Sequence, residues 1–168
     1  MQLNMKIIAV DPGYERLGIA ILKKENGKEI LLFSECFKTS AKLSHSERLN
    51  LIGRELEKII DKYKPEVMAI ETLFFAKNQK SAMQVAEARG VIMYEGKRNN
   101  LEIFEYSPMA VKIAVTGYGK SDKIQVTEMV KKLIKIEKLI KHDDEYDAIA
   151  VGLTFFATEK ENKRSRSV

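Results

Sequence analysis

The sequence predicts an α/β fold in which a mixed five-stranded sheet carries helices on both faces. Three apolar segments open the chain, separated only by tight turns, whereas the later apolar segments are separated by amphipathic helical stretches. Strands joined by hairpins run antiparallel, and strands joined through a helix run parallel. The 168 residues, 45% of them apolar and 32% charged, fit one soluble domain over 1–158 and a basic, disordered tail over 159–168.

The expected strands are short apolar runs that contain β-branched residues. Asn26 and Gly27 form a dipeptide that is typical of a hairpin turn, and they connect the second strand to the third. The first and fourth strands are candidates for neighbours at the centre of the sheet. The five strands are expected over residues 5–10, 18–22, 29–38, 66–70 and 101–106.

The helices are indicated by their start and stop signals and by apolar side chains at helical spacing. Ser44 and Glu47 have the spacing of a capping box, and Pro65 ends the helix that they begin. The next helix is rich in small residues, so its face allows close packing on the sheet or on a partner. This helix is expected over 78–98, and a short one follows near 108–114. Ser121 is expected to cap the next helix, and the last helix begins at Asp143 or Asp144.

Positive charge is concentrated in one part of the chain. The net charge is +5, and residues 112–141 alone contain eight lysines against three acids. This pattern suggests a polyanionic partner such as nucleic acid, although lysines also solubilise exposed helices. The sequence has no apolar window of 18 residues and no secretory signal pattern, and its single Cys36 has no partner for an internal disulfide. We therefore expect a cytoplasmic protein with no membrane partner.

Four acids stand at positions that the expected fold brings together. Asp11 follows the first strand, Glu71 ends the fourth, and Asp144 and Asp147 share one face of the last helix. Clustered carboxylates repel one another unless a cation neutralises them, and oxygen ligands select a hard cation such as Mg²⁺ or Mn²⁺. The four acids therefore suggest a site for divalent ions, with two feasible, acting on a phosphodiester.

Each acid also has a purely structural interpretation. Asp11 precedes Pro-Gly, where an aspartate commonly forms local hydrogen bonds in a turn. Glu71 could end a strand in solvent, and Asp144 could simply cap a helix. His142 and Asp143 crowd the place of Asp144, so the third acid is open, and His142 itself is a bystander, a ligand or a proton donor.

Two residues of the first turn complete the set of candidates. Arg16 either contacts phosphate or faces solvent, and Gly18 would permit close approach of the backbone to a neighbouring segment or to substrate. The run GYGKS is not a phosphate-binding P-loop, because position 114, where that motif needs glycine, is alanine. Cys36 is expected to pack in the core, and no nucleophile–histidine–acid arrangement is suggested.

Four segments together resemble the RuvC family of Holliday junction resolvases: IAVDPGYERLGIAIL, IETLFFAKNQKSAMQVAEARGVI, VKIAVTGYGKSDKIQVTEMV and DEYDAIAVGL. The resemblance spans about residues 5–158, in the family's order and spacing. It implies a ribonuclease-H-like fold and a homodimeric crossover junction endodeoxyribonuclease that cuts two opposed strands of four-way DNA. It also implies Mg²⁺ as cofactor, with two ions in each active site and Mn²⁺ able to substitute, and work beside a RuvA/RuvB-type branch-migration complex.

The resemblance also assigns roles to individual residues. An aromatic side chain after a catalytic strand can stack on a DNA base, although it can equally pack under the following helix. Lysines near the carboxylates would contact phosphate and stabilise the transition state. The implied catalytic residues are Asp11, Glu71, Asp144, Asp147 and Lys123, of which the four acids bind metal. The implied DNA contacts are Phe74, Lys112, Lys120 and Lys123, while Asn78 and Arg89 lie in matching motifs without a clear role.

Two other functions compete with this interpretation. The first is another ribonuclease-H-like enzyme, such as a YqgF-type RNA nuclease, which shares the DxGxxxxG start. The run FFAKNQKSAMQVAEARG and the D-x-x-D ending favour the RuvC family over it. The second is a junction-binding protein that does not cleave. The intact acids argue against it, because binding a polyanion gains nothing from clustered carboxylates.

Overall fold

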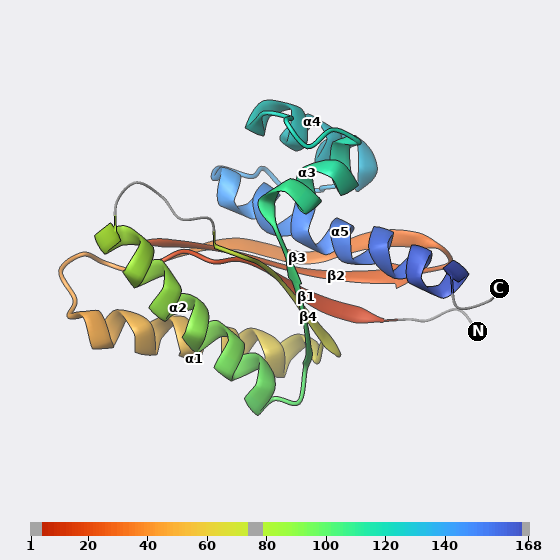
Figure 1. Ribbon diagram of the computed structural model, residues 1–168. Helices are drawn as coiled ribbons and strands as arrows, with labels where there is room; N and C mark the ends of the chain where they lie inside the picture. Colours follow the sequence, from red (N-terminus) through yellow and green to blue (C-terminus); the bar gives the residue numbers. More distant parts are fainter. Residues whose placement is uncertain (1–4, 74–78, 166–168) are drawn as a thin grey trace.

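Five strands form one sheet in the order β3-β2-β1-β4-β5 (Figure 1). The computed structural model describes residues 5–73 and 79–165, with only the backbone described for 159–165. β1 pairs antiparallel with β2 and parallel with β4, so the first and fourth strands are central neighbours, as predicted. The strands are β1 Lys6–Asp11, β2 Arg16–Glu25, β3 Lys28–Lys38, β4 Val67–Glu71 and β5 Glu102–Tyr106.

Helices cover both faces of the sheet, which confirms the predicted α/β architecture. α1 and α2 pack on one face, and α3, α4 and α5 pack on the other (Figure 1). Alternate residues of β1 supply the two cores: Ile8 and Val10 face α1 and α2, whereas Ile7 and Ala9 face α5. The helices are α1 His45–Tyr63, α2 Gln79–Arg98, α3 Pro108–Thr116, α4 Lys123–Leu133 and α5 Asp143–Ser165.

The local signals predict most helix ends. The capping box of α1 forms as expected. The Ser44 hydroxyl accepts a hydrogen bond from the backbone N–H of Glu47, and the Glu47 carboxylate accepts one from the backbone N–H of Ser44. The expected cap of α4 is wrong by one residue: Asp122, not Ser121, accepts from the backbone N–H of Gln125. Ser121 is instead buried against the preceding turn, where its hydroxyl donates to the Tyr118 carbonyl at 2.8 Å.

Helical backbone in α5 continues to Ser165, into the segment 159–168 that the sequence predicts to be disordered. The added turns consist largely of Glu, Lys and Arg, which are good helix formers. Within the described ranges, neither α5 nor any other helix has the length and apolar character needed to cross a membrane.

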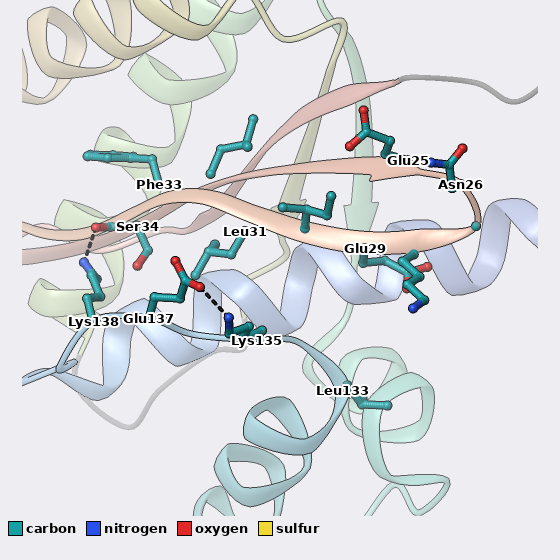
Figure 2. A pocket seen from close by; sticks show the side chains of 14 residues that line it. Glu25, Asn26, Glu29, Leu31, Phe33, Ser34, Leu133, Lys135, Glu137 and Lys138 are labelled. Carbon is teal, nitrogen blue, oxygen red and sulfur yellow. Dashed lines mark hydrogen bonds and ion pairs between the residues drawn. The ribbon is translucent and has the colours of Figure 1, made fainter.

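The segment that joins α4 to α5 crosses the outer edge of the sheet. A cavity of about 1040 Å³ lies between this segment and β3, lined by Leu31, Phe33 and Leu133 among others (Figure 2). At one end the Lys138 ammonium donates to the Ser34 carbonyl and pairs with Glu145. Glu145 is buried in the first turn of α5 and also accepts from the Ser34 hydroxyl at 2.8 Å. These contacts fix the start of α5 on the edge of β3.

Candidate active site

Two acids stand together where the two central parallel strands end. Asp11 is the last residue of β1 and Glu71 the last residue of β4, and the register pairs Val10 with Ile70 just before them. The two carboxyl groups are close enough that a hydrogen bond between them raises the pKa of Asp11 and works to lower the pKa of Glu71. The structure therefore brings the first two predicted acids into contact.

α5 delivers the other two predicted acids from above the sheet. A Cβ on Gly18 of β2 would lie 2.1 Å from the carbonyl oxygen of Asp144 and 3.3 Å from Cβ of Ala148. Only glycine therefore lets the first turn of α5 approach β2 so closely. The segment that approaches the backbone at Gly18, as expected from the sequence, is α5. Because β2 pairs Gly18 with Asp11, this contact places Asp144 and Asp147 over the end of β1.

The cluster holds more negative charge than its surroundings favour. Burial, followed by the charges of Glu71, Asp147 and Asp144, raises the pKa of Asp11 well above its ordinary value. Burial also raises the pKa of Glu71, an effect partly opposed by the hydrogen bond from Asp11 and by the charge of Lys123. Half-buried carboxylate oxygens that destabilise one another when ionised suit a divalent cation.

Lys123, the first residue of α4, neutralises part of α5. Its ammonium lies 2.6 Å from Oδ2 of Asp143 and 3.0 Å from Oδ2 of Asp147. Burial works to lower the pKa of Lys123, but hydrogen bonds to these two carboxylates outweigh it and raise the pKa. Burial raises the pKa of Asp147, while Lys123 opposes that rise and lowers the pKa of Asp143.

The environments of Asp143 and Asp144 differ. Asp144 is 15% exposed and is among the charges that act on Asp11, whereas Asp143 is 47% exposed and pairs with Lys123. Asp144 also contacts Arg16, with Nε 3.4 Å from its Oδ2, and the Cys36 thiol at 3.7 Å. This placement favours Asp144 as the third acid of the cluster. Among the described residues, no three His, Cys, Asp or Glu side chains form a ready metal-binding group. Asp144 and Asp147 pair instead with Arg16 and Lys123.

A cleft opens beside the carboxylates. It has a volume of about 260 Å³ and is lined by Glu71, Asp147, Lys112 and Lys123 together with apolar side chains of α3, α4 and α5. Both lysines also act electrostatically on Glu71. Lys120 lies in the exposed turn between α3 and α4, away from this lining. Phe74 lies outside the described residues.

Sequence reasoning left two cationic contacts unassigned. Arg89 of α2 donates from Nε to the backbone carbonyl of Glu71 at 3.2 Å and pairs with Glu105 of β5. The position of Arg89 in a segment that resembles the RuvC family was the sequence signal that could have pointed to this contact. The pairing of Arg16 with Asp144 joins residues far apart in the chain, and the nearness of Arg16 to Asp11 was its sole signal. Cys36, expected in the core, is half-buried and touches the same carboxylate.

The fold and this cluster together define a class of enzyme. Acids end two adjacent parallel strands of a mixed sheet, and a helix packed across those strands adds further acids. This is the arrangement of a ribonuclease-H-like nuclease, in which carboxylates and a divalent cation act on a phosphodiester.

Comparison with known proteins gives the family. The family model described as crossover junction endodeoxyribonuclease RuvC matches residues 7–155. The RuvC of Fusobacterium nucleatum is 43% identical over 150 residues, covering 89% of this chain and 79% of that protein. The RuvC of Thermosipho melanesiensis is 44% identical over 148 residues, covering 88% and 94%. The chain belongs to the RuvC family of crossover junction endodeoxyribonucleases.

A solved structure agrees with this assignment. Thermus thermophilus RuvC in complex with a Holliday junction substrate superposes with a TM-score of 0.87 at 28% identity, covering 94% of this chain and 96% of that one. The ribonuclease-H-like fold and the RuvC membership expected from the sequence are therefore both confirmed.

Proposed function

We propose that this protein is a Mg²⁺-dependent endonuclease that resolves four-way DNA junctions by paired phosphodiester hydrolysis as a homodimer. The observation that carries the proposal is the half-buried cluster of Asp11, Glu71 and Asp147, with Lys112 and Lys123 in the adjoining cleft. Acids alone would repel DNA, and lysines alone would only bind it. Their combination serves an enzyme that holds metal against a phosphate.

The four acids are the metal ligands in this proposal. Asp11 and Glu71 come from rigid strand ends, while Asp144 and Asp147 come from the first turns of α5. Their donors are all carboxylate oxygens, which fit Mg²⁺ and allow Mn²⁺ to substitute, and four acids suffice for two ions. A bound ion pair would supply an activated water and neutralise charge on the leaving oxygen.

The lysines bind and orient the substrate. Lys123 lies between the α5 acids and the cleft, so its ammonium is within reach of a phosphate placed over the cluster. Lys112 also lines the cleft, and Lys120 extends the positive surface along the backbone of bound DNA. Phe74 is proposed to stack on a base near the crossover.

The junction is the proposed substrate because a related enzyme is described in complex with one. A four-way junction presents two equivalent strands, and a two-fold dimer places one active site on each. A RuvA/RuvB-type complex is the expected partner in the cytoplasm.

A nicking assay on synthetic four-way junctions tests the proposal. Asp11→Asn should lower the cleavage rate more than about 100-fold, because loss of a metal ligand costs more than loss of a group that only orients one. Junction binding should be kept or strengthened, since only the repulsive cluster has changed. Wild-type protein that binds junctions without cutting them in Mg²⁺ or Mn²⁺ would refute the nuclease, and preferential cutting of RNA would favour the YqgF-type alternative.

Two matched variants then locate the third acid. Asp144→Asn is expected to abolish cutting, whereas Asp143→Asn removes an identical charge that faces Lys123 and should retain most of the activity. The opposite order would assign the position to Asp143.

A further inference from the structure

Arg16 is placed at the edge of the carboxylate cluster with most of its guanidinium unused. It begins β2, two residues before Gly18, on which the first turn of α5 packs. Its Nε lies 3.4 Å from Oδ2 of Asp144, and 51% of its side chain is exposed, against 15% for Asp144. Among the described residues, the guanidinium makes no other hydrogen bond or ion pair that would hold it in place.

The contact is not needed to hold α5 on the sheet. The backbone of Asp144 already lies against Gly18, and Glu145 is anchored to Ser34 and Lys138 on β3. A single contact from a half-exposed arginine adds little to folding stability, because exposed ion pairs are weak. Its location at the cluster therefore requires an explanation other than packing.

The cations around the cluster come from different elements of the fold. Lys123 and Lys112 come from α4 and α3 and line the cleft beside Glu71 and Asp147. Arg16 comes from β2 and reaches Asp144. A DNA strand laid across the carboxylates would be within reach of both the lysines and the guanidinium. The guanidinium fork binds phosphate oxygens in pairs, which an ammonium group does not do.

We propose that Arg16 is a displaceable counterion: it neutralises Asp144 in the metal-free protein and contacts the DNA backbone when Asp144 is engaged by the divalent cation. This inference rests on the proposed function, because it takes Asp144 to be a metal ligand. Arg16 thus competes with metal for one carboxylate and gains a phosphate partner in exchange.

Calorimetric titration of DNA-free protein with Mn²⁺ tests the first half of the proposal. Arg16→Gln should bind Mn²⁺ about two- to five-fold more tightly, since the competing ion pair is weak. Arg16→Lys keeps the charge and should stay near the wild-type affinity. Lys38→Gln is the matched control, because Lys38 lies opposite Arg16 on the neighbouring strand β3 and carries the same charge. Unchanged or weaker Mn²⁺ binding by Arg16→Gln, or equal tightening by Lys38→Gln, overturns the counterion role.

The salt dependence of junction binding in Ca²⁺ tests the second half. Loss of one phosphate contact should reduce the slope of log affinity against log salt by about one in Arg16→Gln. An unchanged slope overturns the phosphate contact and with it the proposal. Failure of the proposed function is distinguishable, because wild-type protein would then bind no Mn²⁺, or Asp11→Asn would bind it as well as wild type.

Discussion

Gly18 shows how a residue without a side chain determines the geometry of the site. Its missing Cβ would collide with the carbonyl of Asp144, so any other residue would push the first turn of α5 off β2. Asp144 and Asp147 would then move away from Asp11, which is fixed at the end of β1. One glycine on a central strand thus determines whether acids from the two ends of the chain can share a cation.

Glu35 shows the cost of a carboxylate outside the active site. It lies on β3 facing α1, and one of its oxygens, Oε1, is buried with no hydrogen-bond partner among the described residues. Burial, followed by repulsion from Glu55, raises the pKa of Glu35. A carboxyl group whose pKa is raised by folding stabilises the fold at acidic pH, and this contribution is lost as pH rises through the folded-state pKa.

We therefore expect Glu35→Gln to stabilise the protein at pH 8 and to have little effect at pH 4. The side chain is only partly buried and solvent screens it, so the rise in melting temperature at pH 8 should be about 1–3 °C. Thermal unfolding at both pH values measures the difference. Glu102 is exposed on β5, so Glu102→Gln is the control and should leave the melting temperature unchanged at both pH values. An equal gain for Glu35→Gln at both pH values would contradict the assignment of the effect to ionisation.

At the scale of elements, local sequence was sufficient for most of the fold. Short apolar runs bounded by Pro, Gly and Asn define the strands, and Asn26 adopts the positive φ of 50° that the predicted hairpin requires. The cap of α4 was misassigned because Ser121 and Asp122 are both good caps, and the hydroxyl of Ser121 is engaged in hydrogen bonds with Thr116 and Tyr118 of the preceding turn. Helix in 159–165 was missed because a polar, charged composition is shared by tails and exposed helices.

The candidate site was predictable only in part. Asp11 and Glu71 could be paired because parallel neighbours end at the same edge of a sheet. The contacts of Lys123, Arg16 and Arg89 could not be predicted from the sequence, because they join elements whose distance depends on packing rather than on sequence spacing. The close approach of α5 at Gly18 is the packing feature that creates two of these contacts, those of Lys123 and Arg16 with the acids of α5.

Arg89 links α2 to the ends of β4 and β5. Its bond to the Glu71 carbonyl holds the backbone of a proposed metal ligand, and its ion pair with Glu105 holds the guanidinium. Arg89→Met should lower the junction cleavage rate about 10-fold, the lower range for loss of a group that orients a ligand. Junction affinity in Ca²⁺ should change much less, because Arg89 contacts protein rather than DNA in this arrangement.

The partner residue supplies the control for Arg89. Glu105→Gln breaks the ion pair but leaves the donor to Glu71, so its cleavage rate should fall less than that of Arg89→Met. A rate equally reduced in both variants, or an unchanged rate in Arg89→Met, would show that Arg89 does not position Glu71.

At the scale of the molecule, the two faces of the sheet have different surfaces. The lysine-bearing elements α3 and α4 lie with α5 on one face, and α2 lies with α1 on the other (Figure 1). Along α2, Met83 and Tyr94 are 66% and 64% exposed, and a Cβ on Gly90 would meet nothing within 4 Å. These three residues share one helix face, because they are spaced by seven and four positions. An exposed apolar stripe with an unfilled glycine suits contact with a second copy of the helix.

If α2 forms the two-fold interface, a bulky charge at its centre should separate the protomers. Gly90→Arg places two like charges close together across the axis, since every residue near a two-fold axis meets its own copy. Light scattering at micromolar concentration should then show a mass near 19.2 kDa instead of twice that value. Cutting of a cruciform plasmid should shift from linear to nicked product, because the two incisions are no longer made within one complex.

The control for the interface is an exposed apolar residue elsewhere. Leu139 is 84% exposed in the segment between α4 and α5, whose Ile136 and Ile140 pack on the opposite face of the sheet from α2, so Leu139→Arg should leave the dimer and the linear product intact. A dimer that persists in Gly90→Arg would place the interface on another surface. A monomer that still yields linear product as fast as wild type would show that paired incision does not depend on the dimer. The combination of a monomeric mass, normal Mn²⁺ binding and single nicks would separate the interface from the metal site, since Gly90 lies outside the carboxylate cluster.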